Sequence, residues 1–263
     1  MKTHKTRTGA RRIRPNEVPA GKLVIIPYVR PVGTPDSLAM AIRGWRMFCK
    51  EPVRLVVLGD RPECAGAFPD VSFVPAEQGD NPHVSVSRSL MAYLPAVGDD
   101  CFYLTADDIV PVSAFSLDQL DSAPLSARQL LLEPAAGNYY IADMVRTKSE
   151  LEARGIEFRN YSVHVPHRYD RRMYLKMCED FRLDSVALDP ETLYYCVSGA
   201  QSAGACDERQ GTLAHTVLPF DDIRELRGKL RNVVFINFGG SLTDRRYYDL
   251  ISDYLDETAD TDS

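Results

Sequence analysis

The chain has 263 residues, of which 44% are hydrophobic and 26% are charged, and its formal net charge is −6. This composition is typical of a folded globular protein and excludes an intrinsically disordered one. No apolar run approaches the roughly 20 residues that span a bilayer, and the N-terminus lacks the apolar region of a signal peptide. The six cysteines are scattered without a CxxC pair, so we expect a cytoplasmic protein without structural zinc.

The charge is unevenly distributed along the chain. Residues 1–16 hold six lysines and arginines and no acid, and the remainder has 25 basic against 37 acidic residues. An acidic body disfavours an extended nucleic-acid-binding face. We expect residues 1–20 to be a flexible basic tail, able to contact an anionic partner, and residues 256–263 to be a frayed acidic tail. Residues 21–255 between them are predicted to form one domain.

Alternating strands and helices are predicted for the first half of the chain. Apolar runs predict strands over residues 22–29, 53–58, 71–74 and 101–105, with helices over 37–49 and 81–94. Asp36 or Ser37 is the expected N-cap of the first helix. This order predicts an α/β fold of Rossmann-like type, a mostly parallel sheet flanked by helices.

The second half is less regular, and the pattern of apolar and polar residues changes near Pro124. Its patterns predict a hairpin from residues 129–132 and 138–141, strands over 162–167, 192–197 and 232–237, and helices over 146–154, 170–181 and 243–255. Asp170 is the expected N-cap of the helix that it begins.

Two adjacent carboxylates, Asp107 and Asp108, follow the strand predicted over residues 101–105. A charged pair at the end of a buried strand needs compensation, and Mg²⁺ or Mn²⁺ would supply it. The alternative is a solvated loop that caps a helix beginning near Pro111. Ligands bind beyond the carboxyl ends of parallel strands, so Arg30, Asp60 and the acidic pair are expected to face one crevice.

The order of these parts resembles the A-type (GT-A) glycosyltransferase fold. The similar stretches are residues 24–30, 55–60, 81–94 and 102–109, although the acids here are adjacent and the usual motif is Asp-x-Asp. The resemblance implies a metal-dependent, hexosyltransferase-like enzyme that uses a nucleotide-activated sugar, most simply a UDP-sugar, with Mn²⁺ or Mg²⁺. It also implies a nucleotide-binding half over 21–123 and an acceptor half over 124–255, the acceptor being a saccharide, a protein or a modified nucleic acid.

A second likeness is to the Stealth-type sugar-phosphate transferases and related phage or capsule glycosyltransferase-like proteins. The segments that carry it are residues 39–45, 105–108 and 164–167. It implies transfer of a sugar phosphate instead of a sugar. A third possibility is a degenerate transferase domain that only binds or assembles.

The resemblance assigns roles to five residues. Asp107 and Asp108 would bind the cation, Arg30 and Arg88 would donate to phosphate oxygens, and Asp60 would bind the ribose or base. The alternatives are a surface arginine at Arg88 and an ordinary turn residue at Asp60.

Histidines are the remaining candidates. His164 would complete the metal shell or act in acid–base chemistry. With His167 beyond Pro166, the alternative is one histidine paired in the core and one exposed. His83 is expected to be an ordinary surface residue, and His215 has no partners in the pattern.

Two further features are left open by the sequence. The loop at Gly239 and Gly240, followed by Arg245 and Arg246, would attract an anion, or would simply be a tight turn with Thr243 as N-cap. Aromatic residues are expected in the core or as sugar-stacking walls; they are Trp45, Tyr139, Tyr140, Tyr194, Tyr195, Tyr247 and Tyr248.

Overall fold

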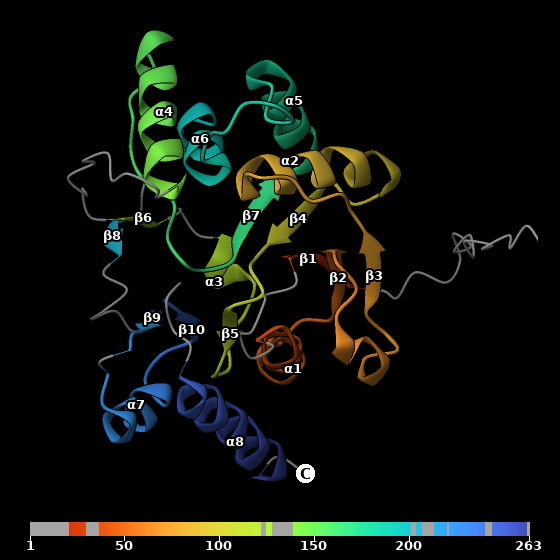
Figure 1. Ribbon diagram of the computed structural model, residues 1–263, viewed down its shortest axis with the longest axis vertical. Helices are drawn as coiled ribbons and strands as arrows, with labels where there is room; N and C mark the ends of the chain where they lie inside the picture. The colour runs from red at the N-terminus through yellow and green to blue at the C-terminus, as the bar shows by residue number, and fades with distance from the viewer. Residues whose placement is uncertain are drawn as a thin grey trace, which may run out of the picture.

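The computed structural model describes residues 21–29, 37–121, 125–127, 139–200, 204–206, 213–219, 221–239 and 244–261. A five-stranded sheet lies at its centre, in the order β3-β2-β1-β4-β7 (Figure 1). Its strands are β1 (Lys22–Tyr28), β2 (Val53–Gly59), β3 (Ser72–Pro75), β4 (Cys101–Leu104) and β7 (His167–Asp170). All neighbours run parallel except β7, which is antiparallel to β4. The mainly parallel α/β sheet predicted from the sequence is confirmed.

The sheet separates two hydrophobic cores, because successive side chains of a strand point to opposite faces. In β1, Val24 and Ile26 belong to one core, whereas Leu23 and Ile25 belong to the other. All four are at most 1% exposed. Burial on both faces explains why the central strands read as continuous apolar runs.

Helices cover both faces of the sheet (Figure 1). The helix α1 (Leu38–Phe48) packs on one face, and α2 (Pro82–Tyr93), α4 (Tyr139–Ala153), α5 (Arg171–Phe181) and α6 (Pro190–Val197) contribute to the core on the other. Trp45 of α1 is fully buried and meets the Phe115 ring edge-on at 5.3 Å. The short elements η2 (Glu63–Ala67), η3 (Leu94–Ala96) and α3 (Asp118–Asp121) connect the layers.

A second, three-stranded sheet extends the core on the α1 side, in the order β5-β10-β9. Its strands are β5 (Ile109–Pro111), β9 (Ala214–Val217) and β10 (Phe235–Phe238), and the helices α7 (Ile223–Leu230) and α8 (Arg245–Thr261) lie beside it (Figure 1). A two-stranded sheet pairs β6 (Leu125–Ala127) with β8 (Gly204–Cys206).

The two sheets are held together where α1 crosses β5. A Cβ atom added to Gly44 would lie 2.4 Å from the carbonyl oxygen of Pro111. No side chain fits at that distance, so glycine permits the helix to rest directly on the strand. Close packing here fixes β5 against the layer that carries the central sheet.

Several helices and strands confirm the sequence predictions closely. Strands β1 to β4 and helices α1, α2 and α5 lie within two residues of the predicted ranges. Ser37 is the N-cap of α1, and Asp170 is the N-cap of α5, where its carboxylate accepts from the Met173 N–H at 2.8 Å. The last predicted strand is β10, shifted toward the C-terminus.

Four predictions for the second half are wrong. Residues 192–197 are helical in α6 and not a strand, and residues 162–166 precede β7 without forming one. Residues 139–141 begin α4 instead of a hairpin, so the helix predicted over 146–154 is one end of a longer one. The acidic segment from 256 to 261 continues α8 instead of fraying.

Some expectations fall elsewhere. The basic tail of residues 1–20, the segment 129–132, Arg30, Asp36 and Thr243 all lie outside the described residues. Among the helices that the structure describes, none has the length and apolar character needed to cross a membrane.

Candidate active site around Asp107 and Asp108

Asp107 and Asp108 lie in the turn that joins the two sheets. The strand β4 ends at Leu104, and the N–H of Thr105 still donates to the Ile25 carbonyl of β1 at 3.1 Å. The chain then turns and enters β5 at Ile109. The helix expected near Pro111 is therefore absent, because Pro111 ends a strand, and the helix-capping explanation of the acidic pair is wrong.

Both carboxylates are partly buried, and they interact electrostatically with side chains from distant parts of the chain. Burial raises the pKa of Asp108, and the charge of His164 opposes that increase. Burial also raises the pKa of Tyr139 and of Tyr248, and the charge of Asp108 raises both further. His164, Tyr139 at the start of α4 and Tyr248 of α8 therefore lie within electrostatic reach of the acidic turn.

The two tyrosines differ in exposure. Tyr248 is buried and stacks on Phe238 of β10, with 4.3 Å between ring centroids. Tyr139 is 51% exposed, one of the most exposed large hydrophobic side chains in the described structure. The sequence named both as core or wall residues without connecting them to the acids. The positions of the two tyrosines in the sequence do not indicate that both lie within reach of Asp108. That proximity depends on where the fold places α4 and α8.

Asp60 lies at the same edge of the sheet as the acidic pair. It follows β2, and its N–H donates to the Tyr28 carbonyl at the end of β1 at 3.0 Å. Because β1 lies between β2 and β4, the chain ends of these two strands are about 10 Å apart at about 4.8 Å per strand. Gly59 has a φ of 135° and lets the chain pass within contact of Tyr28 before Asp60.

Arg88 lies on α2, and its guanidinium donates to the carbonyl oxygen of Asp184 at 2.7 Å. The side chain also lines a cavity of about 440 Å³ between α2 and the edge strand β3, with Leu58, Val74, Glu77 and Tyr93 among the other lining residues. The predicted phosphate contact of Arg88 stays a prediction.

The two histidines around Pro166 have different surroundings. His167 is 3% exposed, and its Nε2 lies 3.1 Å from the Val163 carbonyl oxygen. His164 is exposed, and its charge acts on Asp108. The alternative of one core and one exposed histidine is therefore the arrangement found, and His164 remains the candidate for chemistry.

His83 and His215 are not the unremarkable residues expected from the sequence. His215 is buried, with its Nε2 3.3 Å from a carboxylate oxygen of Asp221. His83 Nδ1 lies 2.8 Å from Oδ2 of Asp143, and its Nε2 lies 3.8 Å from Oδ2 of Asp189. These two carboxylates are at most 1% exposed.

Asp143 is the centre of this buried cluster. Asn81, the N-cap of α2, donates to it at 2.9 Å, and Arg146 donates to its other oxygen. Burial by itself would raise the pKa of Asp143, but the hydrogen bonds from His83 and Asn81, with the charges of His83 and Arg146, lower it. The charges of Asp143 and of Asp108 both act on Tyr139, so this tyrosine lies within electrostatic reach of the cluster and of the acidic turn.

The donor set at the turn fits a magnesium or manganese ion that keeps waters and binds substrate phosphates. Such ions commonly use only one or two protein carboxylates. Asp107 and Asp108 supply two, and His164 is the nearby imidazole. Among the residues that the structure describes, no cluster of three or more metal-ligating side chains occurs, so a closed all-protein cage is not the arrangement that these residues form.

Comparisons with known proteins give similarities only to solved structures. No protein-family model matches the chain, and no curated protein does. The glycosyltransferase GlyE of Streptococcus pneumoniae TIGR4 aligns with 92% of this chain at 9% identity and a TM-score of 0.44, and the match spans 64% of GlyE. The galactosyltransferase LgtC, solved with donor and acceptor sugar analogues, aligns with 88% of this chain and 95% of its own at 12% identity, with a TM-score of 0.43. The bifunctional glycosyltransferase WbbM aligns with 91% of this chain and 50% of its own at 12% identity, with a TM-score of 0.47.

Proposed function

We propose that this chain is a glycosyltransferase that uses a nucleotide-activated sugar, with a UDP-sugar as the first candidate, together with Mn²⁺ or Mg²⁺. One observation carries the proposal. Two adjacent, partly buried carboxylates lie in the turn at the carboxyl edge of a parallel sheet, within electrostatic reach of an imidazole and two phenols. That edge is where α/β sheets bind ligands.

The reaction requires the negative charge that develops on the departing diphosphate to be stabilised. The bond between the anomeric carbon and the diphosphate oxygen breaks, a bond to an acceptor oxygen forms, and the acceptor loses its proton. A divalent cation held by Asp107 and Asp108 would neutralise the negative charge that develops on the diphosphate. His164, which is exposed and whose charge acts on Asp108, is the residue that we assign to acid–base work.

The remaining roles follow from position. Asp60 lies on the same edge as the acidic turn and would accept hydrogen bonds from the ribose or the base. Tyr139 offers a half-exposed ring within electrostatic reach of Asp108 and Asp143, a suitable wall for a sugar. Arg30 and Arg88 are proposed to bind the phosphates, and residues 124–255 to bind the acceptor.

The test is a panel of nucleotide sugars incubated with the full chain and Mn²⁺, with chromatographic analysis of the released nucleotide. We expect one donor to be hydrolysed slowly without acceptor, releasing a nucleoside diphosphate. The Asp108→Asn variant should lose both this release and Mn²⁺-dependent nucleotide binding. Asp100→Asn, an exposed acid just before β4, is the matched control and should keep both. Unchanged nucleotide affinity in Asp108→Asn would remove the assignment.

The product also separates this proposal from its rivals. Release of a nucleoside monophosphate would indicate sugar-phosphate transfer, the reaction implied by the Stealth-type likeness. A structural role for a degenerate domain predicts that no nucleotide, with or without Mn²⁺, raises the melting temperature, because a ligand that binds only the folded state would stabilise it.

A further inference from the structure

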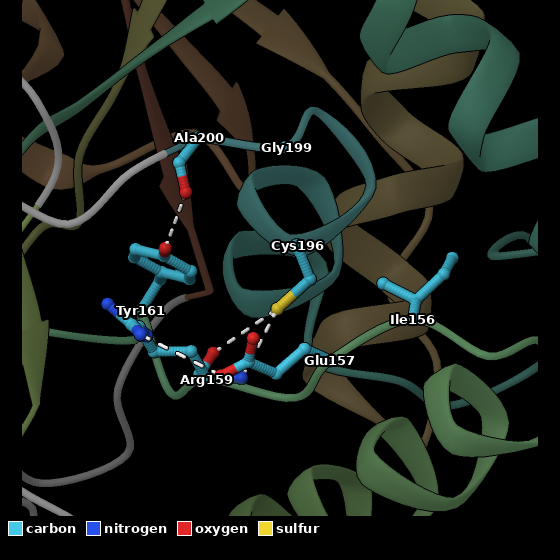
Figure 2. A pocket seen from close by; sticks show the side chains of 7 residues that line it. All are labelled: Ile156, Glu157, Arg159, Tyr161, Cys196, Gly199 and Ala200. Atoms are coloured by element: carbon cyan, nitrogen blue, oxygen red, sulfur yellow. Dashed lines mark hydrogen bonds and ion pairs between the residues drawn. The ribbon is translucent and has the colours of Figure 1, made fainter.

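A separate cavity of about 340 Å³ lies between the segment that follows α4 and the end of α6 (Figure 2). Its lining residues are Ile156, Glu157, Arg159, Tyr161, Cys196, Gly199 and Ala200. This volume falls at the small end of the roughly 300–1,000 Å³ found for small-molecule sites. A ligand of one or two rings would fill it.

The walls of this cavity are fixed by hydrogen bonds across it. The Tyr161 hydroxyl donates to the Ala200 carbonyl at 2.8 Å, and the Arg159 N–H donates to the Cys196 sulfur at 3.4 Å. The Cys196 thiol donates back to the Arg159 carbonyl at 3.3 Å. Figure 2 shows these contacts tying the end of α6 to the segment below it. Half of their donors and acceptors are backbone groups and none belongs to a charged side chain, so the shape does not depend on the charges of Glu157 and Arg159.

The charged side chains of Glu157 and Arg159 are available to a ligand. Their closest oxygen and nitrogen are 3.7 Å apart, and the two side chains are 85% and 48% exposed. One carboxylate and one guanidinium offer strong acceptors and forked donors with no net charge. A phosphate would meet the carboxylate, and a purely apolar ligand would take both charges out of water without offering either of them a hydrogen bond.

The chemistry that matches is a neutral ring bearing several hydroxyl groups. Its hydroxyls would donate to Glu157 and accept from Arg159, and its C–H face would pack on Ile156, which closes the side of the cavity away from Tyr161 (Figure 2). A pyranose ring has these properties.

The cavity is also close along the chain to His164, the residue that we assign to acid–base work. Tyr161 is three positions before His164, and three residues of fully extended chain span at most about 11 Å. Cys196 is in the last turn of α6, whose N-cap, Asp189, belongs to the buried cluster beside Tyr139. We propose that this cavity binds one sugar ring of an acceptor saccharide. The binding of a sugar is inferred from the cavity itself, and its role as acceptor rests on the proposed function.

The experiment measures sugar binding without nucleotide. The probes are the methyl glycosides of glucose, galactose, mannose and N-acetylglucosamine, titrated to tens of millimolar and followed by saturation-transfer NMR. We expect at least one to bind saturably. Arg159→Ala should weaken that binding about tenfold, because it removes hydrogen bonds to a charged group. Glu157→Gln should weaken it less, because the amide still accepts a hydrogen bond.

Lys176→Ala is the control, since Lys176 is 74% exposed in an ion pair with Asp180 on α5, away from the cavity. It should bind as the wild type does. Saturable binding that is equal in Arg159→Ala and the wild type, or no saturable binding of any probe, would overturn the proposal. Donor hydrolysis by the wild type is measured separately, because it needs no acceptor. Glycoside binding without hydrolysis would keep the cavity and reject the proposed enzyme, and the reverse result would do the opposite.

Discussion

Nδ1 of His83 lies 2.8 Å from Oδ2 of Asp143, and this contact joins the start of α2 to the first turns of α4. Asp143 has no exposed surface and is bonded by Asn81 and Arg146 as well. The junction of α2 with α4 therefore rests on a buried ionic cluster, and the contribution of this cluster to stability can be measured directly.

Replacing Asp143 should destabilise the fold strongly. The Asp143→Asn variant keeps the shape but removes the charge that compensates His83 and Arg146. Breaking a buried ionic contact costs about 3 kcal/mol, which chemical denaturation will measure. The matched control is Asp180→Asn, which breaks an exposed i,i+4 pair with Lys176 on α5 and should cost less than about 0.5 kcal/mol. Equal losses in the two variants would contradict this assignment.

Acid should remove the contribution of Asp143. Its pKa is lowered in the folded state, so its stabilising effect is fully present above the unfolded value of about 3.9 and is lost as pH falls through the lower folded value. His83, Asn81 and Arg146 face this carboxylate, and Asp189 lies on the other side of His83. Between pH 5 and pH 2, the difference in unfolding free energy between wild type and Asp143→Asn should shrink. A difference that stays constant over this range would refute the lowered pKa.

Gly44 should tolerate no side chain. In Gly44→Ala the new methyl group would lie 2.4 Å from the Pro111 carbonyl oxygen, so α1 must move away from β5. Overpacking of this kind costs about 1–3 kcal/mol. Gly228→Ala in α7 is the control, because nothing lies within 4 Å of its added Cβ, and alanine should there stabilise the helix by up to about 1 kcal/mol. Thermal unfolding of both variants should move the melting temperature in opposite directions.

The Tyr139 ring should matter for the donor and little for the fold. Tyr139→Ala is expected to weaken donor binding about fivefold, since an aromatic contact is worth roughly 1 kcal/mol. Tyr139→Phe keeps the ring and should bind the donor nearly as the wild type does. Calorimetric titration of the donor in the presence of Mn²⁺ measures both. Equal affinity in all three proteins would show that this ring is not part of the donor site.

The first half of the fold was predictable because its signals are local. Val24 to Ile26 and Leu55 to Val57 are buried on both faces of the sheet, and such strands are continuous apolar runs. Asp170 is an N-cap that the sequence displays directly. The position of Asp107 and Asp108 at the end of a core strand was predictable for the same reason.

The second half was not predictable to that degree because its local signals conflict with one another and its main cluster joins distant segments. The run from Thr192 to Val197 has aromatic and β-branched residues, which favour a strand. Asp189 and Pro190 nevertheless start a helix, with the Asp189 carboxylate accepting from the Thr192 N–H at 2.7 Å. The cluster around Asp143 has no sequence signal at all, because its members come from three separate segments of the chain.

The acidic turn at residues 105–108 is anchored in a different sheet at each end. An ion held by its carboxylates would therefore tie together two layers that otherwise meet mainly through apolar packing. Amide hydrogen exchange in β5 and β10 would slow when the ion binds to the acidic turn, although neither strand supplies a metal ligand. Hydrogen exchange in the three-stranded sheet would thus indicate whether the acidic turn holds a metal ion.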